Sequence, residues 1–362
     1  MTDPFKSFYK GKRILVTGHT GFKGSWLSIW LRELGATVVG ISMDPYTERD
    51  NYVLSGLKDK MTDLRGDIRN GDLMKKIFAE YQPEIVFHLA AQPLVRLSYE
   101  KPVETYETNV MGTIQIMEAI RATPSVKVAV LITTDKCYEN REQIWGYRED
   151  EPMGGYDPYS SSKGASEIAI ASWRRSFFNP KDFNKHGKSI ASVRAGNVIG
   201  GGDWALDRII PDCIRSLEAN QTIDIRSPHS IRPWQHVLEP LSGYLLLATK
   251  MWAEPTRYCE GWNFGPKQDS IATVWDVATQ VIQNYGTGTL KDISDPNAFH
   301  EAGLLMLDIS KAKFKLGWEP QMDINECIHM VVDWYKRYRK MDTYSLCVEQ
   351  IQTYCQTIKK ST

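Results

Sequence analysis

Short hydrophobic runs alternate with amphipathic stretches along the first half of the chain. The runs are bounded by turn residues and predict strands at residues 13–17, 37–41, 84–89, 127–133 and 189–194. Apolar side chains recur at helical spacing between these runs and predict helices at residues 25–34, 72–81, 106–121 and 158–175. Because strands and helices alternate, we expect a parallel sheet covered on both faces.

The pattern becomes irregular beyond about residue 195. Short apolar pieces occur at 223–225, 262–264 and 304–307, and further helical runs occur at 238–251, 272–285 and 324–338. We therefore predict an α/β protein with a Rossmann-type doubly wound parallel sheet in residues 1–195. Residues 196–362 are expected to form mainly a smaller C-terminal α/β substrate-binding lobe. The segment near 236–265 is expected to return to the sheet.

Composition narrows the class of protein. The chain has 362 residues, of which 42% are apolar, so a core can form without disulfides. Lys+Arg and Asp+Glu both number 44, and because there is no polybasic run we expect neither a nucleic-acid nor a membrane partner. No apolar signal segment is visible, which predicts a cytoplasmic protein. The six cysteines have no CxxC spacing, so we expect neither a metal site nor a disulfide framework.

Three glycines lie between the first predicted strand and the first predicted helix, in Gly18-His-Thr-Gly21-Phe-Lys-Gly24. Backbone N–H groups at such a junction can hold a pyrophosphate, and the spacing is GxxGxxG rather than GxGxxG. Asp44 lies 20 residues past Gly24, where a carboxylate would bond a ribose 2′-OH and favour NAD over NADP. The alternative for Asp44 is a turn residue before Pro45.

Tyr159 and Lys163 are four residues apart in a helical stretch, so both side chains project from one face. A nearby ammonium lowers the pKa of a phenol from its usual value of about 10, which would make Tyr159 a base for a substrate hydroxyl. A lone YxxxK pattern is a weak signal, and its alternative is a surface pair. The pattern gains weight because it follows a glycine turn and the strand end at Thr134.

Thr133-Thr134-Asp135-Lys136 follows the hydrophobic run at 127–133, at the edge of the sheet where ligands of such folds bind. A threonine hydroxyl there can bond a substrate oxygen beside Tyr159. Asp135 and Lys136 add two proton-transfer groups that simple hydride exchange does not need, and these suit the loss of water from a ketone. The alternative is that Asp135 caps the next segment and that Lys136 is a solvated cation.

These motifs together resemble the extended short-chain dehydrogenase/reductase family over about residues 10–340. The resemblance rests on GHTGFKG, HLAAQ at 88–92, Asn109 in TNVMGT, and Tyr159-Ser-Ser-Ser-Lys163. It implies NAD as cofactor. The cofactor-binding residues that it implies are Gly18, Thr20, Gly21, Phe22, Gly24, Asp44, Asp67, Ile68, Leu89, Ala90, Ala91, Asn109, Tyr159 and Lys163.

Within that family, Thr-Asp-Lys is similar to the strand end of nucleotide-diphosphoglucose 4,6-dehydratases. The resemblance implies a lyase that oxidises C4, eliminates water across C5 and C6, and returns the hydride to C6. The catalytic residues are then Thr134, Asp135, Lys136, Tyr159 and Lys163. Asp135 is expected to act as acid at the C6 oxygen. Lys136 is either a desolvated base at C5 or an electrostatic stabiliser of the C4 enolate.

The segments GGGDWALDRIIPD and SIRPWQH are most similar to family members that act on CDP-D-glucose. This part of the prediction rests on the resemblance alone, because nothing in the chemistry of these residues identifies cytosine. The substrate-binding residues that we expect are Gln92, Arg96, Asn197, Arg208, Arg232 and His236. The resemblance also implies bacterial deoxysugar and O-antigen synthesis. It implies a homodimer or dimer of dimers, formed through residues 106–121 and 158–175.

Two alternatives remain from the sequence. The first is an NAD-dependent nucleotide-sugar 4-epimerase, which uses the same Tyr159 and Lys163 pair but rotates the ketone instead of dehydrating it. The second is a non-catalytic, NAD-sensing binding protein that kept the fold. The presence of Asp135 and Lys136 beside the pair favours the dehydratase over both.

Overall fold

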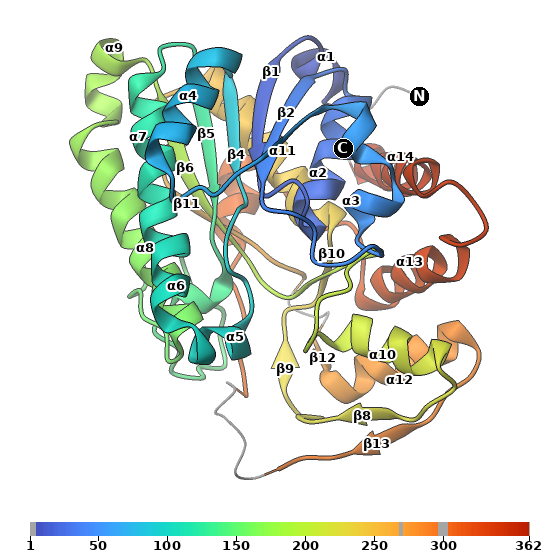
Figure 1. Ribbon diagram of the computed structural model, residues 1–362. Helices are drawn as coiled ribbons and strands as arrows, with labels where there is room; N and C mark the ends of the chain where they lie inside the picture. The colour runs from blue at the N-terminus through green and yellow to red at the C-terminus, as the bar shows by residue number, and fades with distance from the viewer. Residues whose placement is uncertain (1–4, 268–270, 296–302, 362) are drawn as a thin grey trace.

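The computed structural model describes residues 5–267, 271–295 and 303–361. Within them a seven-stranded sheet runs in the order β11-β6-β5-β4-β1-β2-β3, and every neighbouring pair in it is parallel (Figure 1). Its strands are β1 (Arg13–Thr17), β2 (Thr37–Ser42), β3 (Thr62–Arg65), β4 (Ile85–His88), β5 (Val128–Ile132), β6 (Ser189–Ala195) and β11 (Gly261–Phe264). The predicted Rossmann-type doubly wound sheet is confirmed.

The strand order reverses between β1 and β4. From β1 the chain moves outward through β2 to β3, and it then returns to β4 on the other side of β1 before continuing to β5 and β6. Ligands of open parallel sheets bind outside the carboxyl ends of the strands at such a switch point. The glycine turn after β1, the loop after β4 and the Thr134 segment after β5 therefore share one edge.

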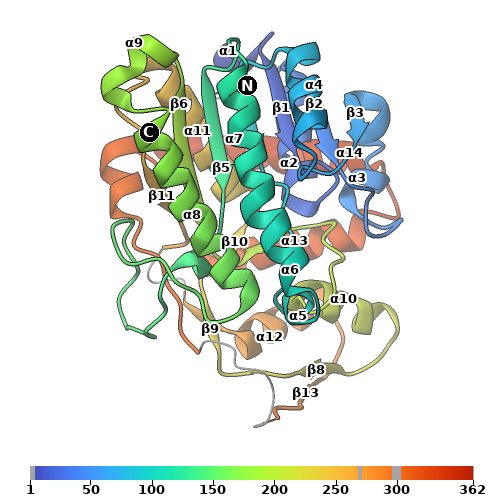
Figure 2. The same cartoon turned by 60° about the vertical axis from the view of Figure 1, so that its left-hand side comes forward.

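Helices cover both faces of the sheet (Figure 2). One face carries α2 (Phe22–Glu33), α11 (Leu238–Ala253) and α14 (Thr343–Ser361), and the other carries α4 (Gly71–Tyr81), α7 (Gly112–Ala122) and α8 (Pro158–Ser176). Side chains of β1 alternate between the two cores, because successive residues of a strand point to opposite faces. Ile14 and Val16 pack in the first core and Leu15 packs in the second.

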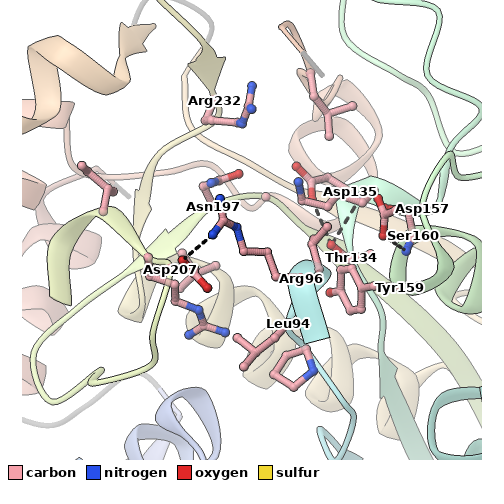
Figure 3. Close-up of a pocket in the computed structure, with 18 of the residues that line it drawn as sticks. Leu94, Arg96, Thr134, Asp135, Asp157, Tyr159, Ser160, Asn197, Asp207 and Arg232 are labelled. Carbon is pink, nitrogen blue, oxygen red and sulfur yellow. Dashed lines mark hydrogen bonds and ion pairs between the residues drawn. The ribbon is translucent and has the colours of Figure 1, made fainter. Parts of the chain in front are cut away.

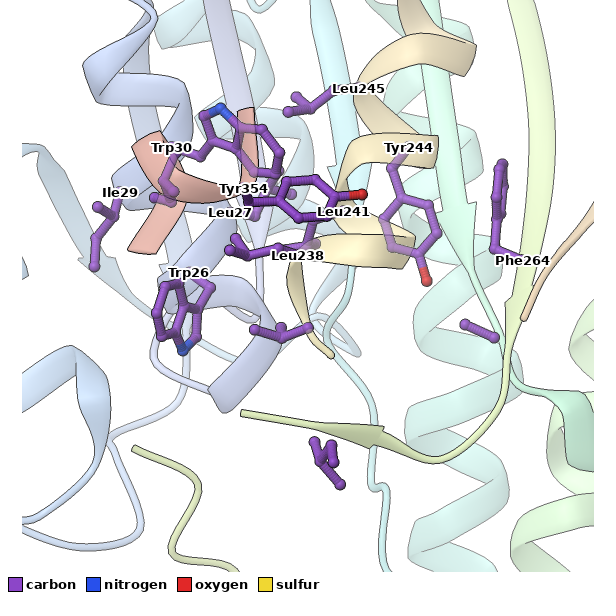
Figure 4. Packing of buried hydrophobic residues seen from close by; sticks show 14 of the residues in the cluster. Trp26, Leu27, Ile29, Trp30, Leu238, Leu241, Tyr244, Leu245, Phe264 and Tyr354 are labelled. Atoms are coloured by element: carbon purple, nitrogen blue, oxygen red, sulfur yellow. The ribbon is translucent and has the colours of Figure 1, made fainter. Parts of the chain in front are cut away.

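The C-terminal helix α14 closes the first core against α2 and α11 (Figure 4). The rings of Trp30 and Tyr354 meet edge to face, with centroids 5.9 Å apart. Both side chains are fully buried, as is Leu241 of α11. Aromatic pairs of this kind add to the stability that their buried area supplies. Residues from the two ends of the chain thus share one core.

Short elements connect the larger ones. The helical ones are α1 (Lys6–Tyr9), α3 (Asn51–Leu54), α5 (Val95–Glu100), α6 (Pro102–Tyr106) and α9 (Phe183–His186). The tighter or wider turns are η1 (Leu57–Lys60), η2 (Glu107–Met111), η3 (Asp135–Cys137), η4 (Pro180–Asp182) and η5 (Ala312–Leu316). Among the described helices, none combines the length and apolarity that crossing a bilayer requires.

Among the described residues that follow β6, three helices and three two-stranded sheets lie beyond the carboxyl edge of the main sheet. The helices are α10 (Ile209–Glu218), α12 (Val274–Tyr285) and α13 (Ile324–Arg337). The sheets pair β7 (Val198–Ile199) with β10 (Gln235–His236), β8 (Ile223–Ile225) with β13 (Leu290–Asp292), and β9 (Ile231–Arg232) with β12 (Ala272–Thr273). The division of the chain into lobes at residue 195 stays a prediction.

Two predicted elements differ from the structure. The helix expected at 106–121 is divided into α6, the wide turn η2 and α7, because Asn109 of η2 bonds to Gln92 and Ser162. The apolar piece at 304–307 contributes only single bridges, to residues 231 and 147. Strand β3 was not predicted, since its sequence TDLR is polar and it lies at the edge of the sheet.

Two glycines of the turn after β1 are needed for different reasons. Gly18 has a φ of +77°, a conformation that residues with a side chain rarely adopt. Gly24 lies inside α2, where an added Cβ would stand 2.0 Å from the Gly18 carbonyl oxygen. A side chain at Gly24 would therefore push helix α2 away from the turn.

We predict that Gly24→Ala destabilises the protein, although alanine ordinarily favours a helix by about 1 kcal/mol over glycine. The overlap with Gly18 should cost about 1–3 kcal/mol of the free energy of unfolding, measured by urea denaturation. Gly21→Ala is the matched control, because a Cβ there would lie 3.4 Å from the same oxygen. Equal stability of the two variants would contradict this account of the turn.

Candidate active site

A cleft of about 890 Å³ lies at the carboxyl edge of the sheet, beneath the later helices and small sheets. It brings together side chains from segments that are far apart in the sequence (Figure 3). The sequence-predicted residues that line it are Phe22, Arg96, Thr134, Asp135, Lys136, Tyr159, Asn197, Arg208 and Arg232. Most of the predicted catalytic and substrate-binding residues therefore face one space.

The Thr134 segment begins where β5 ends. Thr134 caps the short turn η3, and its hydroxyl accepts a hydrogen bond from the Lys136 N–H at 3.4 Å. The same hydroxyl lies 3.0 Å from Asp135 Oδ1, while Asp135 Oδ2 is buried and has no hydrogen-bond partner among the described residues. Burial raises the pKa of the Asp135 carboxyl, although the charge of Lys136 partly offsets the shift. Asp135 is thus suited to hold a proton.

Tyr159 is in the first turn of α8. Pro158 occupies the first helical position, and the Asp157 carboxylate caps the helix by accepting from the Ser160 N–H at 2.9 Å. The Tyr159 N–H donates to the Ser98 hydroxyl at 3.1 Å, which fixes the residue against α5. The local sequence therefore starts the helix at the point that aims Tyr159 into the cleft.

Burial controls the titration of the Tyr159 and Lys163 pair. It raises the pKa of Tyr159 to about 12, although the hydrogen bond with Thr134 acts in the opposite direction. Burial lowers the pKa of Lys163 to about 8, and the positive charge of Lys23 adds to that shift. The sequence led us to expect a lowered phenol pKa. The expectation differs from the structure because the cost of burying a phenolate outweighs the attraction of nearby cations.

A buried ion pair lies next to the Tyr159 and Lys163 pair. The carboxylate of Glu167 on α8 lies 2.9 Å from the Arg194 guanidinium on β6. It also accepts from the hydroxyls of Thr133 at 2.5 Å and Ser192 at 2.8 Å. Burial opposes the charge of Glu167, but Arg194 and the two hydroxyls outweigh it and lower the pKa to about 2. The network therefore fixes β5, β6 and α8 relative to one another.

The glycine turn fits a dinucleotide. No side chain caps the N terminus of α2, so its first N–H groups lie at an edge where a phosphate can approach. Asp44 is exposed just beyond β2, and one of its oxygens accepts from Arg65 at 3.0 Å. Thr20 lies beside them, with its hydroxyl bonded to Ser42 and Met43. An exposed carboxylate at this position suits a ribose diol.

Most of the other predicted cofactor residues lie in the segments that directly follow β3 and β4, and Asn109 lies in η2. Asp67 is paired with Arg69 at 2.6 Å, and Ile68 packs next to Gly112 of α7. The remaining members are Leu89, Ala90, Ala91 and Asn109. The N–H groups of Leu89 and Ala90 both bond to Thr17 at the end of β1, which holds the loop after β4 against the glycine turn.

Two of the predicted substrate residues do not line the cleft. Gln92 is buried, and its side chain bonds to the Leu94 backbone and to Thr105. His236 is fully buried against Trp26, and its Nε2 has no hydrogen-bond partner among the described residues. Burial lowers the pKa of His236 to about 3, so the ring is neutral. The structure supports a packing role for both.

Several charged residues of the cleft were not predicted. Lys23 lines the cleft from the first turn of α2, where the helix dipole disfavours a cation. A lysine at the start of a predicted helix is unusual, and this position could have been noticed in the sequence. Burial lowers the pKa of Lys23 to about 8, and nearby Arg208 contributes. Asp207 and Arg226 also line the cleft and form an ion pair at 2.5 Å. No spacing in the sequence linked these two residues.

The described residues hold no group of three or more His, Cys, Asp or Glu side chains arranged for a metal ion. All six cysteines are buried and free. Burial raises the pKa of Cys137, the last residue of η3, well above its usual value. Its thiol is therefore held in the protonated, unreactive form.

The parallel sheet, the glycine turn and the Tyr159 and Lys163 pair define an extended short-chain dehydrogenase/reductase. The model of the GDP-mannose 4,6-dehydratase family matches residues 15–331, and the chain belongs to this family. It is 52% identical over 342 residues to CDP-glucose 4,6-dehydratase of Salmonella typhimurium, covering 94% of this chain and 95% of that protein. It is 26% identical to dTDP-glucose 4,6-dehydratase of Xanthomonas campestris, covering 89% and 92%. The predicted resemblance to nucleotide-sugar dehydratases is confirmed.

Solved structures share the fold. UDP-glucose 4-epimerase of Thermotoga maritima with UDP-glucose superposes with a TM-score of 0.76 at 23% identity, covering 90% of this chain and 99% of that one. A dTDP-glucose 4,6-dehydratase of Bacillus anthracis in complex with NAD gives 0.75 at 22% identity, covering 92% and 100%. Dehydratases and epimerases have the same architecture, so the fold alone does not separate them.

We predict that Glu167→Gln lowers the free energy of unfolding by about 3–5 kcal/mol at pH 7, because it leaves the Arg194 charge buried and uncompensated. The folded pKa of Glu167 lies below its unfolded value, so this stability is present above about pH 5 and is lost as the pH falls toward 2. The difference from the wild type, measured by urea denaturation, should shrink over that range.

The exposed Glu48 supplies the control for this experiment. Glu48→Gln should change the free energy of unfolding by less than about 0.5 kcal/mol, as most surface substitutions do. A Glu167→Gln variant that is equally destabilised at pH 7 and at pH 3 would contradict the assignment of the buried ion pair.

Proposed function

We propose that the chain is a hydro-lyase that converts CDP-D-glucose to CDP-4-dehydro-6-deoxy-D-glucose and water with NAD as cofactor. The near full-length match to CDP-glucose 4,6-dehydratase of Salmonella typhimurium supports the reaction and the substrate. The observation that carries the proposal is Asp135, a buried carboxyl that opens into the same cleft as Tyr159. An acid beside a hydride-transferring pair is what a dehydration needs.

The chain's own residues are suited to hold the dinucleotide. The turn from Gly18 to Gly24 and the start of α2 would hold the pyrophosphate, Asp44 would bond the adenosine ribose, and Lys163 would bond the nicotinamide ribose. When bound, NAD accepts a hydride from C4 of the sugar and returns one at C6. The related dTDP-glucose 4,6-dehydratase of Bacillus anthracis was solved in complex with NAD.

Tyr159 takes the proton of the C4 hydroxyl as the hydride leaves C4. Burial raises the pKa of Tyr159, so interactions that lower this pKa are needed for the phenol to act as a base. These interactions come from the hydroxyl of Thr134 and from the positive charge of Arg208, both of which lower the phenol pKa. The resulting 4-ketohexose has an acidic C5–H and a hydroxyl at C6, which prepares it for loss of water.

Asp135 gives a proton to the C6 oxygen as water leaves. Its raised pKa keeps the carboxyl protonated further toward neutral pH than an exposed aspartate would be. Lys136 lines the same cleft and is half-buried. It acts either as the base at C5 or as the cation that stabilises the C4 enolate, and both assignments fit its position beside Asp135.

The other end of the cleft is suited to the diphosphate. Arg208 is held by Asp203 at 2.8 Å, and Arg232 donates to the Ile231 carbonyl at 3.0 Å, so both guanidiniums are fixed. Guanidinium groups match phosphate oxygens with paired donors. Asn197 lines the same cleft (Figure 3) and would contact the sugar diphosphate.

We also infer that the protein forms a homodimer, or a dimer of dimers, through α7 and α8. These helices lie side by side on one face of the molecule in Figure 2. Exposed apolar side chains occur on these helices and at their ends: Met111 just before α7, Ile168 on α8 and Phe177 just after α8. Burial of these side chains between two copies would remove them from water.

We predict that the protein, incubated with NAD, turns over CDP-glucose in preference to TDP-, GDP- and UDP-glucose. The product should carry a 4-keto group, which gives a chromophore in alkali, and a methyl group at C6. Chromatography and mass spectrometry measure the loss of one water. A C4 epimer without loss of water would favour the epimerase, and binding without turnover of any of the four would favour a non-catalytic protein.

We predict that Asp135→Asn slows dehydration by about 10²- to 10⁴-fold, the usual contribution of a general acid, and slows C4 oxidation much less. Single-turnover experiments follow NADH formation and water loss separately. Glu139→Gln removes another carboxylate that lines the cleft and should leave both rates nearly unchanged. An equal decrease of the two rates in Asp135→Asn would contradict the division of roles.

A further inference from the structure

Three charged side chains form a bridge across the cleft. Asp207 Oδ1 lies 2.5 Å from Arg226 Nη1 and 3.6 Å from Arg96 Nη1. Arg96 is on α5, which follows β4 of the main sheet, whereas Asp207 and Arg226 precede α10 and follow β8 in the later part of the chain. Figure 3 shows Arg96 extended toward Asp207 through the cleft. The carboxylate thus neutralises guanidiniums from both sides of the substrate space.

The backbone at Asp207 is held in an unusual conformation. Its φ is +61°, which places a residue with a side chain in the left-handed region. Aspartate and asparagine enter this region at lower cost than most residues, but the conformation still requires support from its surroundings. In the free protein the ion pairs to the two arginines keep the carboxylate turned into the cleft.

A second aspartate and arginine pair in the same cleft differs in one respect. Asp203 bonds to Arg208 at 2.8 Å, and its side chain is only 6% exposed, whereas the side chain of Asp207 is 40% exposed. A buried carboxylate cannot leave its partner without a large cost, but an exposed one is held weakly and can be displaced. The first pair fixes an arginine, whereas the second leaves Arg96 and Arg226 open to exchange; Arg226 also lies 3.9 Å from Asp212.

We propose that Asp207 occupies, in the free protein, the place of a substrate phosphate, and that Arg96 and Arg226 form an additional diphosphate subsite from which the incoming nucleotide displaces this carboxylate. The inference rests on the proposed function, because it takes a nucleoside diphosphate sugar as the ligand. A diphosphate offers more charge and more acceptor oxygens than one carboxylate, so the exchange favours the substrate.

The exchange of Asp207 for a phosphate affects the binding of a nucleoside diphosphate in two ways. In the free protein, Asp207 reduces repulsion among the arginines of the cleft and keeps Arg96 and Arg226 near the positions that a phosphate needs. In the complex, the carboxylate must turn away from an anion of the same sign, which costs part of the binding energy. Removal of its charge should therefore strengthen the binding of a nucleoside diphosphate.

The test is calorimetric titration of the full-length protein with CDP, which carries the diphosphate and needs no turnover. Asp207→Asn keeps the size and tolerates the backbone conformation, and it should lower the Kd for CDP by about three- to fivefold, as the loss of one exposed ion pair implies. Arg226→Gln should raise the Kd by about tenfold, because it removes a charged donor to a phosphate.

Asp224→Asn supplies the matched control. Asp224 is on β8 and lines the same cleft, so its substitution removes an equal charge outside the bridge and should shift the Kd less than Asp207→Asn does. A weaker or unchanged affinity for CDP in Asp207→Asn would overturn the proposal, since the carboxylate would then position the arginines without competing with the ligand. An unchanged affinity in Arg226→Gln would overturn it as well.

Failure of this proposal and failure of the proposed function give different results. Titrations with UDP, TDP and GDP in parallel show whether a missing response to CDP reflects only the choice of base. If the wild type dehydrates CDP-glucose but the Asp207→Asn and Arg226→Gln variants bind CDP as it does, only the subsite is wrong. If the variants shift the affinity as expected and no sugar nucleotide is turned over, only the proposed function is wrong.

Discussion

The geometry of the proposed catalytic centre depends on the buried carboxylate of Glu167. It is bonded to Thr133, which lies just before the turn η3, and to Arg194, which precedes the segment that carries Asn197. It also lies one turn beyond Lys163 on α8. A charge in this place can be kept only if every lone pair has a donor, so the two strands and the helix are held at fixed distances. The geometry of the cleft follows from that requirement.

Burial has opposite effects on neighbouring groups of the cleft, and the difference is suited to acid and base chemistry. It raises the pKa of Asp135 and of Tyr159, while it lowers the pKa of Lys163. Each shift follows from the cost of placing a charge in an apolar setting. Groups suited to give and to accept a proton thus lie on the turn η3, which carries Asp135, and on the start of α8, which carries Tyr159 and Lys163.

The arginines of the cleft show how a neutral protein can bind an anion. Arg208 is fixed by a buried aspartate, whereas Arg96 and Arg226 are neutralised by an exposed one. The first arrangement supplies a permanent donor, and the second keeps positive charge available without leaving it unpaired. The net charge of zero therefore does not prevent several arginines from lining the cleft where a diphosphate would lie.

Local patterns in the sequence were sufficient for most strands of the sheet, for the glycine turn and for the pair on α8, but not for the polar edge strand β3. Hydrophobic runs, glycine spacing and the four-residue interval between Tyr159 and Lys163 each report on structure within about one turn or one strand. The position of the Thr-Asp-Lys segment could also be predicted, because the carboxyl ends of parallel strands share one edge of the sheet. What the sequence could not reveal were pairings between distant segments, such as Asp207 with Arg96.

The same distinction explains the differences from the structure. His236 and Gln92 lie in segments that also contain cleft residues, but their side chains are buried and do not line the cleft. The phenol pKa was expected to fall because a lysine is near in sequence, and it rises because the fold buries the ring. The sequence alone determined which elements form and which chemistry they carry. Only the tertiary structure decided which side chains meet and how far each is buried away from water. Desolvation and long-range charge pairing arise only once the helices and the sheet pack together.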